Sequence, residues 1–165
     1  MSKVLITDYV WPNIDAETAI LKAVGIEPIV APDSSVETLT RLAADVDAIM
    51  FCFAQVPAEV LRNAPNCKVA SRYGIGVDNV DIAACTELGI VVTNVPDYCI
   101  DEVADHVMAM ALSFNRKIVR HSAQVKASGW GAVTLNDTMH RLRDRTIGIV
   151  GRGRIGRAVT TRALA

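Results

Sequence analysis

The chain has 165 residues and a formal net charge of −1, and 51% of its residues are hydrophobic. This length allows one domain with a real core, or one domain and part of another, and the composition excludes a disordered chain. No uncharged apolar run reaches the ~18 residues that a membrane-spanning helix needs, so we expect a cytoplasmic protein without a membrane partner.

Charge is divided unevenly along the chain. Residues 1–100 carry six Lys or Arg against 13 Asp or Glu, a net charge of −7, whereas residues 101–165 carry 11 against five, a net charge of +6. A basic second half suits a phosphate-bearing ligand. The alternative is an ordinary solvated face that includes Arg141, Arg143 and Arg145. The near-neutral total gives no reason to expect nucleic acid as a partner.

The four cysteines, at positions 52, 67, 85 and 99, have no CxxC spacing. They lie mostly among apolar residues, a pattern typical of reduced, packed thiols in a cytosolic protein. We therefore expect neither disulfides nor a metal site.

The first hundred residues alternate short β-branched runs with helical patterns. Strands are expected at 3–7, 27–31, 47–51, 67–71 and 90–94, and helices at 16–24, 36–44, 57–64 and 81–89, the last ending at a glycine cap. Apolar runs of this length, separated by helices, predict a parallel sheet covered on both faces. The expected fold is α/β, a flavodoxin-like doubly wound sheet in a domain of residues 1–99 that ends where Pro96 interrupts the pattern.

Residues 100–165 have a different organisation. Apolar residues at steps of three and four predict one long helix over 101–126, with Asp101 and Glu102 at the positive end of its dipole. A loop-like stretch, SGWGAVTLNDT, follows. A strand over 146–150, a glycine-rich turn and a helix come last, and together they read as the start of a second, Rossmann-type domain.

The sequence TIGIVGRGRIGRAV contains a G-x-G-x-x-G motif at Gly151, Gly153 and Gly156. In this motif the first glycine permits a tight turn, the second lets the backbone approach a pyrophosphate, and the third lets the helix pack on the strand. The amides of Arg154 and Ile155 would then point at the phosphates. Because an apolar run precedes the motif and a helical pattern follows it, the context favours dinucleotide binding over a purely structural turn.

A second glycine-rich stretch, SRYGIGVDNVD, follows the fourth expected strand. Doubly wound sheets bind their ligands at the carboxyl ends of the strands. Gly74 and Gly76 would turn the chain and present the amides of Ile75 and Gly76, a donor pair that suits a carboxylate, while Asp78 would cap the next helix. The alternative is a simple strand-to-helix turn that needs a positive φ.

Several motifs in fixed order now resemble one family. RYGIGVDNVDIAACTELGIVVTNVPDYCIDEVADHVMAMAL, then GW, then TIGIVGRGRIGRAV, is similar to the D-isomer-specific 2-hydroxyacid dehydrogenases. The branches it resembles include the hydroxypyruvate/glyoxylate reductases, the phosphoglycerate dehydrogenases and the C-terminal-binding proteins. The match runs from Arg72 to Ala165, and the strand pattern of residues 1–71 agrees with it.

The resemblance implies site residues. The amides of Ile75 and Gly76 would hold a substrate carboxylate beside Gly74, with Ile75 also near the nicotinamide. Val103 would touch the cofactor, NAD or else NADP, and Arg154 and Ile155 would take its pyrophosphate. The remaining implied assignments are the substrate-pocket residues Cys52, Phe53 and Ala54, and Trp130, which either reaches across a homodimer formed through residues 101–145 or is a core or interface aromatic.

The sequence also departs from the family pattern. Arg152 stands where an apolar residue is usual, and Asp105 replaces the commoner glutamate. The arginine, glutamate and histidine of the family mechanism lie downstream of the glycine motif, so no catalytic residue is assigned in this chain. His106, His121 and His140 are expected to be surface or interface residues. We therefore expect the 165-residue chain alone to show no turnover.

The resemblance implies that the parent protein is an oxidoreductase transferring a hydride between a nicotinamide and a small 2-hydroxy or 2-keto acid. Two other interpretations stay open. One is a nucleotide-sensing binding protein similar to the corepressors on this fold, and the other is a truncated remnant with only its first domain folded. The sequence alone names neither the acid nor the choice of NAD over NADP.

Overall fold

The structure is a computed structural model that describes residues 2–130 and 138–165. The chain divides into two compact units, residues 1–98 (unit 1) and residues 99–165 (unit 2). Each unit is described by itself below.

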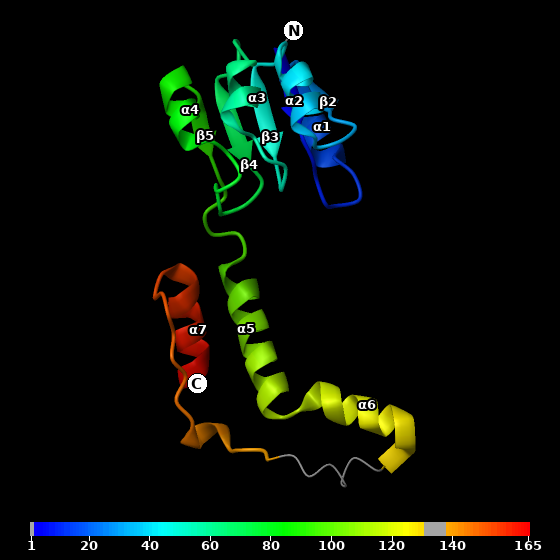
Figure 1. The fold of residues 1–165 in the computed structure, drawn as a ribbon, viewed down its shortest axis with the longest axis vertical. Helices are drawn as coiled ribbons and strands as arrows, with labels where there is room; N and C mark the ends of the chain where they lie inside the picture. Colours follow the sequence, from blue (N-terminus) through cyan, green and yellow to red (C-terminus); the bar gives the residue numbers. More distant parts are fainter. Residues whose placement is uncertain (1, 131–137) are drawn as a thin grey trace. The chain divides into compact units, whose positions relative to one another are not determined.

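Unit 1 is built on a five-stranded parallel sheet (Figure 1). The strands are β1 (Ser2–Ile6), β2 (Ile26–Val30), β3 (Ala48–Phe51), β4 (Val69–Arg72) and β5 (Val91–Thr93). Their spatial order is β2-β1-β3-β4-β5, which is the flavodoxin-like order, so the expected fold class is confirmed. Pro28 lies in β2, an edge strand, where a missing N–H is tolerated.

The helices of unit 1 are α1 (Asp15–Ala23), α2 (Val36–Ala43), α3 (Ala58–Arg62) and α4 (Ile82–Leu88). The Ser35 hydroxyl accepts a hydrogen bond from the Thr38 amide at the start of α2. Asp81, and not Asp78 as the sequence suggested, caps α4 by accepting from the Ala84 amide at 2.9 Å. Gly89 ends α4 with φ +69°, as a glycine cap requires.

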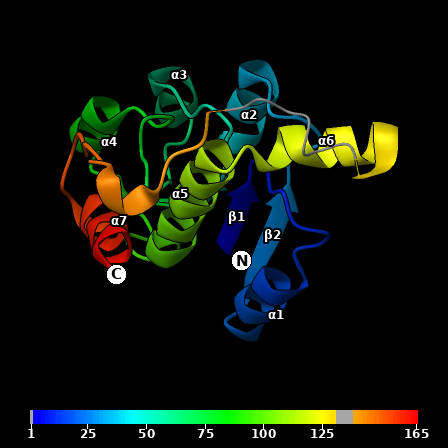
Figure 2. The same cartoon turned by 90° about the horizontal axis from the view of Figure 1, so that it is seen from below.

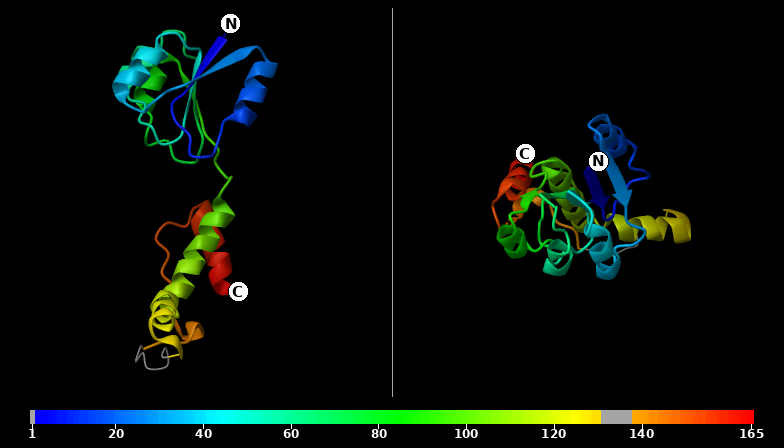
Figure 3. Two further views of the ribbon diagram at one scale, coloured as in Figure 1. Left: turned by 90° about the vertical axis from the view of Figure 1, so that its right-hand side faces the viewer. Right: turned by 90° about the horizontal axis from the view of Figure 1, so that it is seen from above.

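The core of unit 1 lies on one face of its sheet. Figures 2 and 3 show α2, α3 and α4 along that face and α1 on the opposite one. Leu39 of α2, Leu61 of α3 and Cys85 of α4 are buried against Ile49 and Phe51 of β3. In contrast, α1 has no buried residue. Most of the buried apolar surface of the unit therefore comes from a single helix layer packed on the sheet.

Unit 2 contains α5 (Ile100–Asn115), α6 (Ile118–Ser128), a short 3₁₀ helix η2 (Leu142–Asp144) and α7 (Arg154–Leu164). The single long helix expected over 101–126 is wrong, because the chain bends between α5 and α6. At the bend Lys117 has φ +55°, and this left-handed conformation is incompatible with a continuous right-handed helix.

The strand expected over 146–150 is also wrong, because these residues form neither a strand nor a helix. Among the described residues, no other strand lies in unit 2 to pair with them. Val150 is fully exposed as a result. A strand is stable only when neighbours satisfy its backbone groups, so the run forms no strand.

Candidate functional site

The polar residues of unit 1 that suit a ligand lie at the carboxyl ends of β1, β3 and β4. Asp8 follows β1, residues 52–54 follow β3, and the glycine-rich stretch follows β4. In a parallel sheet these ends share one edge, the edge where doubly wound folds bind ligands.

Asp8 is a site residue that the sequence analysis missed. Its carboxylate accepts hydrogen bonds from the backbone amides of Cys52 (2.9 Å), Phe53 (2.6 Å) and Ala54 (3.1 Å), and from the hydroxyl of Thr7 (2.7 Å). Burial of the carboxyl raises its pKa, but these four donors together outweigh burial, so the pKa of Asp8 lies below its ordinary value. The signal available in the sequence was an acidic residue immediately after the first strand.

Asn79 binds the carbonyl groups of the same loop. Its side-chain amide donates to the carbonyl oxygens of Cys52 (3.2 Å) and Ala54 (2.8 Å), and its side-chain oxygen accepts from Nε of Arg72 (3.2 Å). The Arg72 guanidinium carbon lies 5.5 Å from the centre of the Phe53 ring. A cavity of about 230 Å³ opens here, lined by Phe53, Gln55, Arg72, Gly76, Asp78 and Asn79.

The glycine-rich stretch after β4 turns without a left-handed residue, since neither Gly74 nor Gly76 has a positive φ. The carbonyl of Gly74 accepts from the Val95 amide (3.0 Å), and that of Ile75 accepts from the Asn94 side chain (2.8 Å). Within the described residues, no acceptor is bound by the amides of Ile75 and Gly76. Both N–H groups are therefore available to a carboxylate ligand.

The three residues predicted to line the substrate pocket lie in two environments. Cys52 and Ala54 are buried, and only Phe53, at 66% exposure, borders the cavity. Burial raises the pKa of the Cys52 thiol, with the neighbouring Asp8 carboxylate adding to the rise, so this sulfur is a poor nucleophile.

In unit 2 the glycine motif forms a turn followed by a helix. Gly151 has φ +87°, and Gly153 caps the N-terminus of α7, of which Arg154 and Ile155 are the first residues. A Cβ at Gly156 would lie only 2.2 Å from the carbonyl oxygen of Gly151, so only glycine allows this approach. A Cβ at Gly153 would meet nothing within 4 Å, which leaves room for a phosphate group.

Contacts between α5 and α7 hold this turn in place. Ala104 of α5 and Val159 of α7 are buried, and Arg162 of α7 binds the carboxylates of Asp101 (2.9 Å) and Asp105. Both hydrogen bonds raise the pKa of Arg162, and the one to Asp105 has the larger effect. Asp105, noted from the sequence as a departure, thus anchors the helix that follows the glycine turn. Val103 lies in the first turn of α5 and is 36% exposed.

Three of the four remaining candidates lie at the surface of unit 2. Trp130 is 85% exposed, and His106 and His140 are exposed as well. His121 is partly buried, and its Nε2 atom has no hydrogen-bond partner in the described part of the chain. Among the described residues, none of the three histidines forms an ion pair or a hydrogen bond with a carboxylate.

Within residues 2–130 and 138–165, no three His, Cys, Asp or Glu side chains lie close enough together to bind a metal ion. No helix in the same ranges combines the length and the apolarity that crossing a membrane requires.

Comparisons with known proteins cover the whole chain. A profile described as "D-isomer specific 2-hydroxyacid dehydrogenase, catalytic domain" matches residues 4–164. The D-3-phosphoglycerate dehydrogenase of Methanocaldococcus jannaschii is 36% identical over 166 residues, which cover 100% of this chain and 30% of that protein.

Solved structures give the same result. The NAD-dependent formate dehydrogenase of Staphylococcus aureus in complex with NAD is 28% identical with a TM-score of 0.81, and the match covers 98% of this chain and 53% of that one. The NADPH-dependent glyoxylate/hydroxypyruvate reductase of Sinorhizobium meliloti in complex with NADP and malonate is 26% identical with a TM-score of 0.79, covering 98% and 49%. The chain spans 40% or less of the first curated relatives and about half of these solved chains.

Proposed function

Because the chain belongs to the family of D-isomer-specific 2-hydroxyacid dehydrogenases, we propose that it forms part of an oxidoreductase acting on a small D-2-hydroxy or 2-keto acid. Residues 1–99 form the substrate domain, and residues 100–165 begin the dinucleotide-binding domain. A nicotinamide cofactor supplies or accepts the hydride. NAD is the proposed cofactor. One similar structure is in complex with NAD and another with NADP, so binding and turnover are to be measured with both cofactors.

The observation that carries this proposal is the glycine turn before α7. Its left-handed Gly151, open Gly153 and close Gly156–Gly151 contact fit a pyrophosphate at the helix N-terminus. The amides of Arg154 and Ile155 are proposed to bind that pyrophosphate, and Val103 to contact the cofactor.

In unit 1 the amides of Ile75 and Gly76 are proposed to bind the substrate carboxylate. Support comes from their free N–H groups beside the cavity that Gly76 helps to line. No residue of this chain is proposed as the acid–base group, because none of His106, His121 and His140 has a carboxylate partner among the described contacts. We likewise propose no catalytic arginine or glutamate among residues 1–165.

A glycine substitution tests cofactor binding directly. Gly153→Val places a side chain in open space, so the fold is retained while the approach of the phosphates is blocked. Gly148→Val is the matched control, since a Cβ there also meets nothing within 4 Å. We expect saturation-transfer NMR signals from NADH with the wild-type chain and with Gly148→Val, and none with Gly153→Val. Equal signals from all three would contradict the assignment of the turn.

Turnover is tested on two samples. The 165-residue chain is expected not to oxidise NADH or NADPH in the presence of glyoxylate or hydroxypyruvate, because none of its residues is proposed as the acid–base group. The protein isolated from its source, with its intact mass measured, is expected to do so. A source protein that binds NADH and turns over no 2-keto acid would instead favour a nucleotide-sensing binding role.

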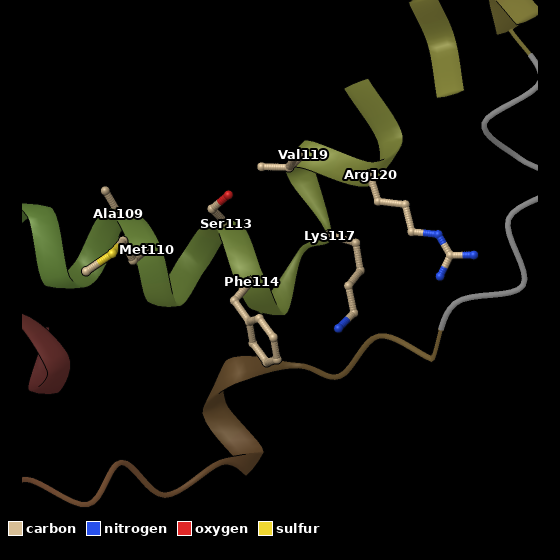
Figure 4. A pocket seen from close by; sticks show the side chains of 7 residues that line it. All are labelled: Ala109, Met110, Ser113, Phe114, Lys117, Val119 and Arg120. Carbon is tan, nitrogen blue, oxygen red and sulfur yellow. The ribbon is translucent and has the colours of Figure 1, made fainter. Parts of the chain in front are cut away.

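We also propose a homodimer formed through residues 101–145. Support comes from the exposed apolar side chains at the bend between α5 and α6, where Phe114 is 77% and Val119 75% exposed. These residues border a cavity of about 510 Å³, and Figure 4 shows Phe114 and Lys117 side by side there, with the Lys117 ammonium 4.4 Å from the ring centre. Apolar patches of this kind are typical of interfaces.

Sedimentation measures the proposed dimer. Val119→Asp is expected to shift the chain to monomer, whereas Val10→Asp, at a 69% exposed position in unit 1, leaves the dimer unchanged. A wild-type chain that is monomeric at all concentrations would contradict the proposal. We further propose a cytoplasmic location, because all four cysteines are free thiols, as is usual in a reducing compartment.

A further inference from the structure

The loop of residues 52–54 has nearly all of its backbone polar groups bound by two side chains from distant parts of unit 1. Asp8 accepts from three consecutive amides, and Asn79 donates to two carbonyl oxygens. Two backbone bonds continue the connection, since the Val56 amide donates to the Asn79 carbonyl (2.8 Å) and the Asp81 amide donates to the Val56 carbonyl (3.1 Å). We call Asp8 and Asn79 together the loop clamp.

The loop clamp contacts two residues whose side chains border the cavity, Phe53 and Arg72. Phe53 has its amide bound by Asp8 and its ring exposed, and Arg72 has its Nε bound by Asn79 and its guanidinium beside that ring. Both border the 230 Å³ cavity together with Gly76. Phe53 and Arg72 therefore form one wall of the cavity, and Asp8 and Asn79 hold that wall in place.

Unsupported, this wall would be mobile. Arginine has several rotatable bonds, and the loop between β3 and α3, which contains residues 52–54, would sample several conformations, so ordering both at the moment of binding costs affinity. Carboxylate–amide hydrogen bonds are stronger than neutral ones, and three of them converge on Asp8. The clamp meets this ordering cost during folding, before a ligand arrives.

We propose that Asp8 and Asn79 are positioning residues that preorganise the Phe53–Arg72 wall for binding of a small 2-keto acid. This inference rests on the proposed function of the cavity. Asp8 does not line the cavity, and Asn79, which does, uses its side-chain oxygen and nitrogen to bind Arg72 and the carbonyls of the loop. Neither residue donates or accepts a proton in the reaction.

The test uses three variants of the 165-residue chain. Asp8→Asn removes the charge that the three amides bind. Asn79→Asp replaces the amide nitrogen that donates to the carbonyls of Cys52 and Ala54 with an oxygen, and it keeps the oxygen that accepts from Arg72. Asn79→Ser removes these three hydrogen bonds without adding a charge. The controls are Asp97→Asn, at an exposed position, and Asn63→Asp, whose side chain donates to the Thr40 carbonyl away from this edge. Thermal unfolding confirms that each variant is folded.

Two readouts separate positioning from general stability. Oxalate, a non-reactive analogue of a 2-keto acid, is titrated while the amide signals of Ile75 and Gly76 are followed by NMR, and hydrogen exchange is measured along unit 1. We expect oxalate affinity to fall about five- to tenfold in the clamp variants and to stay unchanged in the controls. Exchange should accelerate most at residues 52–54 and 72–76, by more than the uniform increase that a loss of global stability gives in the rest of unit 1.

The outcomes are distinguishable. Unchanged oxalate affinity in folded clamp variants would overturn the positioning role, and so would an acceleration of exchange at residues 52–54 and 72–76 no larger than elsewhere in unit 1. If the wild-type chain binds no oxalate, the proposed function of the cavity fails. In that case a preferential acceleration of exchange at residues 52–54 and 72–76 in the variants would still show that Asp8 and Asn79 order the wall. Without this acceleration, the loop clamp would be refuted too.

Discussion

Residues 3–7 and 146–150 are both five-residue runs rich in Val, Ile and Leu, yet only the first contributes to a strand. β1 lies between β2 and β3, and its Val4, Leu5 and Ile6 are each at most 5% exposed. The second run has no neighbouring strand in the described part of unit 2, and Ile147 and Val150 are exposed. Strand propensity is thus expressed only where a sheet exists to receive it.

The same difference appears in how the two units bury apolar side chains. The connected hydrophobic core lies entirely in unit 1, whereas Ala104 and Val159 are the buried apolar residues among the described positions of unit 2. Unit 1 should therefore unfold cooperatively, and unit 2 should respond to substitutions locally. The predictions below test this contrast.

The largest effect is expected for a core aromatic. Phe51→Ala, at a fully buried position of β3, should lower the free energy of unfolding of unit 1 by about 3–5 kcal/mol, because it opens a cavity in the core. Phe114→Ala, at a 77% exposed position of unit 2, should change it by less than about 0.5 kcal/mol. Denaturant unfolding followed by circular dichroism measures both, and similar losses would contradict the contrast.

Asp8→Asn should lower the free energy of unfolding of unit 1 by about 1–3 kcal/mol, since three amide hydrogen bonds lose their charged acceptor. The pKa of Asp8 is lowered by folding, so its contribution is present above the ordinary Asp pKa of 3.8 and is lost as the pH falls through the lower native value. Wild-type stability should therefore fall more steeply than that of the variant in this acid range. Parallel pH profiles would argue against the role of the Asp8 carboxylate.

Two glycines with positive φ give a matched pair. Gly89→Ala forces an alanine to φ +69° after α4 and should cost unit 1 about 1 kcal/mol. Gly129→Ala, at φ +66° after α6, should leave the unfolding of unit 1 unchanged. In a Trp130→Phe background the fluorescence of Trp11, which lies 4.8 Å from Tyr73, reports unit 1 alone. An equal shift in both variants would mean that the units unfold together.

The smallest effect is expected for Arg162→Met, because its partners Asp101 and Asp105 are exposed carboxylates and exposed ion pairs contribute little. Amide exchange should accelerate in α7 and in the first turns of α5, with no change in the unfolding of unit 1. If exchange also accelerates in unit 1, the two units are energetically coupled and the proposed contrast between them is wrong.

The fold of unit 1 was largely predictable because its signals are local. Apolar runs gave every strand, Gly89 marked the end of α4, and the element boundaries differ by one or two residues. The bend at Lys117 was not predictable, because apolar residues continue at positions 114, 118 and 119 and neither Gly nor Pro interrupts them. The missing strand at 146–150 follows from the absence of a partner, which a local pattern does not report.

Only those parts of the candidate site that contain a sequence motif were predictable. Glycine spacing located both turns, and their assigned roles stay predictions. Asp8 and Asn79 were missed because their partners are backbone groups 25–46 positions away, and backbone groups leave no mark in a sequence. Asp105 was noted only as a departure, since its partner Arg162 lies 57 residues further along the chain.

The loop clamp also constrains the order of events during synthesis. The carboxylate of Asp8 leaves the ribosome long before the amides of residues 52–54, and the carbonyls of that loop leave before the side chain of Asn79. β1 and β2 can pair early, whereas the wall of the cavity cannot close until the nascent chain has emerged through residue 79. A ribosome paused earlier than that would expose a chain with part of its sheet and no binding edge.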